Sequence, residues 1–155
     1  MTRPDNIGRG YVAKASISVN APIGKVWDAL TDSEVIKQYM FGTEVVSDWK
    51  EASPIVWKGE WQGKKYEDRG VILKLEPERL IQYSHFSSHS GLPDVRENYH
   101  TVTIELVSDD ARIAISLSQD NNGTEQAREH SEKNWKMMLA ELKKLIENQS
   151  TDKEQ

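Results

Sequence analysis

Near the C-terminus, apolar residues recur at the spacing of an amphipathic helix, and the pattern predicts one long helix over about 124–148. The first half of this helix is polar, so only its second half is expected to be covered. Most of the chain before it reads as strand, and a curved sheet is the surface expected to cover the apolar stripe. A helix covered along part of its length is predicted to leave a cavity at its polar end. The stripe consists of Trp135, Met138, Leu139, Leu142, Leu145 and Ile146.

Alternating apolar and polar residues predict strands in the preceding chain. Residues 13–19 alternate and are expected to form a half-buried strand. Pro22 favours the start of a short helix, and Asp32 or Ser33 can cap a second one that ends near Gln38. Short turns between the later strands predict an antiparallel meander. These strands are expected at about 44–49, 55–62, 66–76, 79–86, 97–107 and 111–119.

Length, charge and cysteine content narrow the class of protein. The 155 residues suit one domain, expected over 11–148, with flexible tails at 1–10 and 149–155. A net charge of −5 argues against a nucleic-acid partner, and the absence of cysteine rules out disulfides and thiolate chemistry. No apolar run approaches the roughly 20 residues of a membrane span. Residues 1–10 lack the apolar centre of a signal peptide, so a cytoplasmic protein without membrane insertion is expected.

Three segments carry a resemblance to a known family. They are 13–32, with the run Val-Trp-Asp-Ala-Leu-Thr-Asp, then 70–81, with the turn Pro-Glu-Arg-Leu, and the helix 135–146. Together they resemble the START-like superfamily, also called SRPBCC or Bet v 1-like, and within it the branch named after the activator of Hsp90 ATPase. Asn134 stands where that family often has glycine. The resemblance implies an α+β helix-grip fold: a curved antiparallel sheet of about seven strands, two short helices and a long C-terminal helix.

The same resemblance implies three kinds of function. The first is binding of a small, largely apolar molecule, lipid-like or aromatic, between the long helix and the sheet, without a cofactor. The second is a cyclase-type or hydrolase-type enzyme. The third is a chaperone-interaction module, with a homodimer as a further possible assembly. The family name comes from cochaperones in which this domain is one of two, whereas this length accommodates one, so chaperone interaction is less expected than ligand binding.

Residues on the inward faces of the predicted strands and helices are the candidates for a ligand site. In the strand near 55–62, Trp57 and Trp61 share a face, and in 97–107 the polar Asn98 and His100 share one with apolar residues. Mostly apolar walls with a few polar groups are typical of a ligand pocket. The predicted lining is Tyr39, Met40, Trp57, Trp61, Tyr83, His85, His100, Trp135, Met138 and Leu142.

His85 and His100 are the candidates for proton chemistry, because imidazole changes its charge near neutral pH. The alternative is that each is a hydrogen-bonded histidine at a strand end. Together with His89 they could ligate zinc, but no spacing rule supports this, so we predict no metal site. Several further charged residues are predicted to form ion pairs on strand surfaces: Glu60, Glu67, Asp68, Arg69, Arg96 and Glu97.

Overall fold

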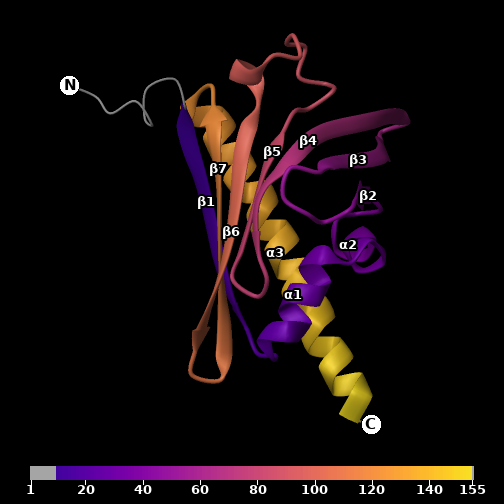
Figure 1. Ribbon diagram of the computed structural model, residues 1–155, viewed down its shortest axis with the longest axis vertical. Helices are drawn as coiled ribbons and strands as arrows, with labels where there is room; N and C mark the ends of the chain where they lie inside the picture. The colour runs from indigo at the N-terminus through magenta and orange to yellow at the C-terminus, as the bar shows by residue number, and fades with distance from the viewer. Residues whose placement is uncertain (1–9, 155) are drawn as a thin grey trace, which may run out of the picture.

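A seven-stranded antiparallel sheet forms the frame of the protein (Figure 1). The computed structural model describes residues 10–154, without the side chains of Trp61 and of 149–154. The strands lie in the order β1-β7-β6-β5-β4-β3-β2, so β2 to β7 form the predicted meander and β1 pairs with β7. The strands are β1 (Tyr11–Val19), β2 (Glu44–Ser47), β3 (Pro54–Trp61), β4 (Lys64–Glu76), β5 (Leu80–His85), β6 (His100–Asp109) and β7 (Arg112–Asn122).

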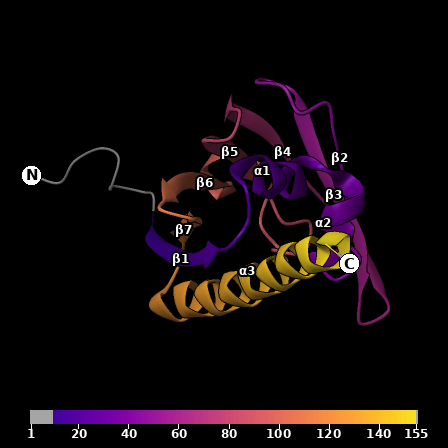
Figure 2. The ribbon, with the colours of Figure 1, turned by 90° about the horizontal axis from the view of Figure 1, so that it is seen from below.

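Three α-helices lie against this sheet: α1 (Ile23–Thr31), α2 (Ser33–Tyr39) and α3 (Glu125–Glu154). Asp32 caps α2 by accepting a hydrogen bond from the Glu34 backbone, at 2.9 Å, as its side chain predicts. Thr124 caps α3 in the same way, because its hydroxyl accepts a hydrogen bond from the Ala127 backbone at 3.0 Å. Figure 2 shows α3 running along the sheet on the side of β1, its main packing partner. The predicted α+β helix-grip fold is therefore confirmed.

The apolar stripe of α3 joins the core as predicted. Met138, Leu139, Leu142 and Ile146 are buried, whereas Trp135 lies partly exposed at the start of the stripe. The inward positions of the strands complete the core, because alternate side chains point to the same face. N-terminal to Trp135, most residues of α3 are exposed. The helix is thus covered along part of its length.

Some predicted boundaries are wrong. The strand expected over 97–107 begins at His100, because Arg96–Asn98 form a 3-10 turn. The Asn98 side chain donates to the Pro93 carbonyl at 2.9 Å, so it does not share a strand face with His100. The long helix continues to Glu154, beyond its predicted end near Asn148. The predicted N-terminal tail lies almost wholly outside the described residues, and the flexibility of both tails and the single-domain limits stay predictions.

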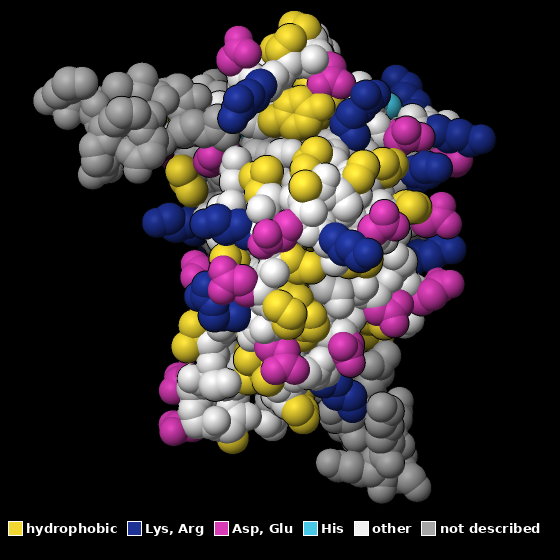
Figure 3. Space-filling model, in the orientation of Figure 1, with side chains coloured by type: hydrophobic (Ala, Val, Ile, Leu, Met, Phe, Trp, Pro, Cys, Tyr) yellow, Lys and Arg dark blue, Asp and Glu magenta, His cyan; other side chains and the backbone are white. Residues whose placement is uncertain are grey.

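The surface carries both signs of charge. On the face shown in Figure 3, basic and acidic side chains are interspersed. Within residues 10–154, none of the helices is long and apolar enough to cross a membrane.

Candidate functional site

A cavity of about 120 Å³ lies between the start of the α3 stripe and the sheet. Among the described side chains of α3, Trp135 alone lines this cavity, and the sheet residues come mainly from β3, β4 and β5. The cavity therefore sits where the covered part of α3 gives way to the exposed part. Its lining residues are Met40, Thr43, Trp57, Tyr66, Asp68, Tyr83, His85, Val102, Gln119 and Trp135.

Asp68 and His85 form a hydrogen-bonded pair in this cavity. Asp68 Oδ2 lies 3.0 Å from His85 Nε2, and the two side chains are 16% and 25% exposed. Asp68 Oδ1 accepts from the Ser88 backbone N–H and hydroxyl, at 3.0 and 3.1 Å. Burial alone would raise the pKa of Asp68, but the hydrogen bonds from His85 and Ser88 outweigh it and lower that pKa. Because an ionised carboxylate only accepts, His85 Nε2 carries the proton and Nδ1 holds the lone pair of the neutral ring.

The lowered pKa of Asp68 makes a prediction for stability. Asp68→Asn is expected to reduce the free energy of unfolding by roughly 1–3 kcal/mol at pH 7, since hydrogen bonds to a charged group are lost. A lowered folded pKa stabilises the protein above the unfolded pKa of about 4, and this stabilisation disappears as pH falls through the folded value. Urea unfolding at pH 7 and pH 3 should therefore show a smaller difference between the two proteins at pH 3. A difference independent of pH, or an equal effect of Glu67→Gln on the exposed neighbour, would contradict the prediction.

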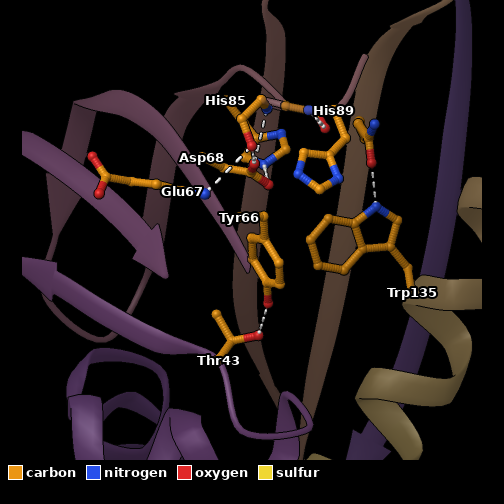
Figure 4. A network of polar contacts seen from close by, with 10 residues as sticks. Thr43, Tyr66, Glu67, Asp68, His85, His89 and Trp135 are labelled. Atoms are coloured by element: carbon orange, nitrogen blue, oxygen red, sulfur yellow. Dashed lines mark hydrogen bonds and ion pairs between the residues drawn. The ribbon is translucent and has the colours of Figure 1, made fainter. Parts of the chain in front are cut away.

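Aromatic rings form a large part of the cavity wall. The Trp57 ring lies 5.1 Å from that of Tyr83, and 4.8 Å from that of His85, which it meets edge to face. Tyr66 lies across Gly59 on the neighbouring strand, where a Cβ atom would collide with the phenol ring. Its hydroxyl is hydrogen-bonded to Thr43 at 2.7 Å (Figure 4). Glycine at position 59 thus allows Tyr66 to form part of the wall.

Two polar groups of the wall, the Trp135 indole N–H and the Tyr83 hydroxyl, differ in whether they have a hydrogen-bond partner in the protein. The Trp135 indole N–H donates to Gln119 Oε1, and this bond holds the indole against β7 (Figure 4). Tyr83 makes no hydrogen bond through its hydroxyl within the described part of the chain. Since no fully buried side-chain oxygen or nitrogen described here lacks a partner, this hydroxyl keeps some accessible surface, and Tyr83 lines both cavities. Burial raises the pKa of Tyr83, so the hydroxyl stays protonated at neutral pH.

A second, smaller cavity of about 30 Å³ continues toward α1 and α2. Met40, Trp57, Tyr83 and Trp135 line both cavities. Tyr39 lines only the smaller one and donates its hydroxyl to the Ala29 carbonyl at 2.9 Å. Such a volume suits one or two water molecules rather than a ligand.

The predicted site residues divide into three groups. Met40, Trp57, Tyr83, His85 and Trp135 line the larger cavity, and Tyr39 and Met138 line the smaller one. The other three lie elsewhere or are not described. The His100 ring stacks on that of His85 with 6.1 Å between the ring centroids, and its Nδ1 is hydrogen-bonded to the Asp120 carbonyl. Leu142 is buried in the core and lines neither cavity. The Trp61 side chain lies outside the described residues.

Several lining residues were not among the predicted ones. Asp68 was expected in a surface ion pair, which is wrong, because it faces inward and binds His85. Thr43, Tyr66 and Val102 were also missed, whereas the alternation of β7 does place Gln119 on the inward face. Arg69 pairs with Asp94 at 3.3 Å on the exposed side. Among the residues that the structure describes, no group of three or more His, Asp or Glu side chains could hold a metal ion.

Solved structures of similar proteins share this architecture. A protein of Cytophaga hutchinsonii, known from its solution structure, is 54% identical, with 92% of this chain and 98% of that chain covered and a TM-score of 0.81. A Mesorhizobium loti protein is 16% identical over 89% of this chain and 98% of that one, with a TM-score of 0.74. The Aha1 dimer from Colwellia psychrerythraea is 18% identical over 88% and 96%, with a TM-score of 0.69. At these lower identities the likeness shows the fold alone.

Family assignment rests on the sequence match together with this fold. None of the proteins with curated descriptions matches the chain. The family model described as "Activator of Hsp90 ATPase homolog 1-like protein" matches residues 20–147, which span α1 to most of α3. The chain therefore belongs to the activator of Hsp90 ATPase homologue 1-like family, as its sequence motifs indicate.

Proposed function

We propose that this protein binds a small, largely apolar molecule, or the end of a longer one, in the larger cavity. The observation that carries the proposal is a hollow walled by Trp57, Tyr66, Tyr83 and Trp135, with the Asp68–His85 pair among its few polar groups. Mostly apolar walls with a few placed polar groups are the usual composition of small-molecule sites. The helix-grip fold of the family is compatible with this role.

The volume limits what can enter. Drug-sized ligands occupy pockets of roughly 300–1,000 Å³, whereas an enclosed cavity of about 150 Å³ is enough for benzene. At about 120 Å³, the cavity suits one small ring or a branched group of similar bulk. A longer ligand would therefore leave its remaining part outside.

Neutral probes of this size test the proposal. We expect toluene, p-cresol or 3,3-dimethylbutan-1-ol to change the tryptophan fluorescence and raise the melting temperature, because a ligand at 100 times its Kd stabilises the folded state by about 2.7 kcal/mol. Val102→Phe places a ring into the cavity and should weaken binding at least about tenfold. Val107→Phe on the same strand is the matched control, since Val107 is 57% exposed. Absence of binding by all three probes, or equal weakening by both variants, would refute the proposal.

The Asp68–His85 pair favours a second candidate function, proton transfer to or from the bound molecule. A carboxylate that holds a histidine in one orientation is the arrangement used in general acid–base catalysis. His85 Nδ1 would accept the proton, and Asp68 would stabilise the imidazolium that forms. In this function His85→Gln would abolish turnover of a substrate while leaving its binding near the wild-type value.

Dimer formation and chaperone binding, which would use the protein surface, stay predictions. The solution structure from Colwellia psychrerythraea is of an Aha1 dimer, and its likeness to this chain extends to the fold alone. Binding to a chaperone would use the outer sheet face or the loops and would not need the cavity. Blocking the cavity with Val102→Phe therefore separates ligand binding from both surface functions.

A further inference from the structure

We propose that the group bound in the larger cavity is a methylated ammonium, a cation whose surface is apolar. This inference rests on the proposed function, because it names the chemistry of the group that the cavity takes up. Three features of the lining support it: the sign of its charge, its aromatic walls and the state of its hydrogen-bond acceptors.

The charge of the lining is negative. Of the described residues around the cavity, Asp68 is the only carboxylate, and neither lysine nor arginine is among them. When the His85 imidazole is neutral, the lining therefore carries one negative charge. Arg69, the nearest arginine in sequence, is exposed and paired with Asp94. With His85 neutral, the part-buried Asp68 carboxylate attracts a cation and repels an anionic ligand, more strongly than a carboxylate in water does.

The walls suit a cation as well as they suit an apolar group. Trp57, Tyr66, Tyr83 and Trp135 all line the cavity, and a cation is attracted to the face of such a ring within about 6 Å of its centroid. The Tyr66 hydroxyl is engaged with Thr43, and the Trp135 N–H is engaged with Gln119. These two residues therefore offer ring surface rather than hydrogen bonds to a ligand.

The acceptors in the wall distinguish a methylated ammonium from a primary one. Both oxygens of Asp68 already accept hydrogen bonds, from His85 and Ser88, and Gln119 Oε1 accepts from Trp135. A primary ammonium has three N–H donors, for which the lining leaves the Tyr83 hydroxyl, His85 Nδ1 and the remaining lone pairs of Asp68, so it would lose part of its hydrogen bonds to water. A quaternary ammonium has no N–H donor, so it incurs no such loss. Its methyl groups also fit a volume of about 120 Å³.

Two probes of the same shape test the charge. Choline and 3,3-dimethylbutan-1-ol differ in that a positively charged nitrogen replaces a neutral carbon. With the full chain at pH 8, we expect choline to bind at least about tenfold more tightly than the alcohol in calorimetric titrations. Asp68→Asn should bring this ratio close to one, because it removes the negative charge from the lining. Glu67→Gln removes the same charge from an exposed neighbour and should preserve the ratio.

The outcomes separate this inference from the proposed function. If the alcohol binds as tightly as choline, the ammonium inference is wrong while ligand binding in the cavity stands. If choline, the alcohol, toluene and p-cresol all fail to bind, both proposals are wrong. An unchanged ratio in folded Asp68→Asn would also overturn the inference, and if that variant does not fold, the ratio measured with the wild-type protein decides.

Discussion

Gly70→Ala is expected to lower the free energy of unfolding by about 3 kcal/mol or more. A Cβ atom on Gly70 would collide with the Ser84 carbonyl oxygen and lie 2.6 Å from the Ser84 carbonyl carbon. These are backbone atoms of the adjacent strand, so no side-chain rotation relieves the contact. Urea unfolding at pH 7 measures the effect, which corresponds to a fall in melting temperature of roughly 6–12 °C.

The site should also respond to this substitution. Gly70 lies between Asp68, which binds His85, and Ile72, after which the register of β4 with β5 shifts. Moving the two strands apart at Gly70 is expected to lengthen the Asp68–His85 contact and weaken probe binding. Gly123→Ala is the matched control, because a Cβ atom there would meet nothing within 4 Å. A loss of stability as large for Gly123→Ala as for Gly70→Ala would contradict the steric argument.

Leu142→Ala is expected to lower the free energy of unfolding by about 3–5 kcal/mol, because it leaves a void in the core beneath α3. Leu142 is 0% exposed and belongs to the stripe that holds the helix to the sheet. Met137 lies on the same helix and is 49% exposed, so Met137→Ala should change stability by less than about 0.5 kcal/mol. Guanidinium unfolding of both variants gives the comparison.

The position of Leu142 also makes a prediction about function. Because Leu142 lines neither cavity, Leu142→Ala should leave the affinity for neutral probes within about threefold, measured where the variant is folded. Val102→Phe should show the opposite pattern, with weaker binding and a smaller loss of stability. A large loss of probe affinity in Leu142→Ala alone would mean that the ligand occupies a different part of the interior.

Much of the fold is predictable from local patterns. In β7, Ile113, Ile115, Leu117 and Gln119 alternate with outward residues, and all four are buried. The stripe of α3 repeats at the helical period, and the short turns between β2 and β7 allow only a few pairings. Each of these signals lies within a few residues of sequence, so it can be read without knowing what lies opposite.

The polar part of the site is not predictable in this way. In β4, Tyr66, Asp68 and Gly70 lie among charged and polar residues, so the first half of the strand resembles an exposed surface strand. Asp68 meets His85 because two adjacent strands approach closely at Gly70. The alternation suggested equal roles for His85 and His100, yet only His85 lines the cavity.

The amino-acid sequence by itself determined the type and order of the helices and strands, the apolar positions of their inward faces and the family of this protein. Backbone conformation and the burial of one face repeat every two or 3.6 residues, and such periods are visible along a single chain. Only the tertiary structure decided that Asp68, His85, Tyr66 and Gln119 surround one hollow beside Trp135. That arrangement depends on strand register, on a close backbone approach at one glycine and on the volume left unfilled, and these properties arise between segments far apart in the chain.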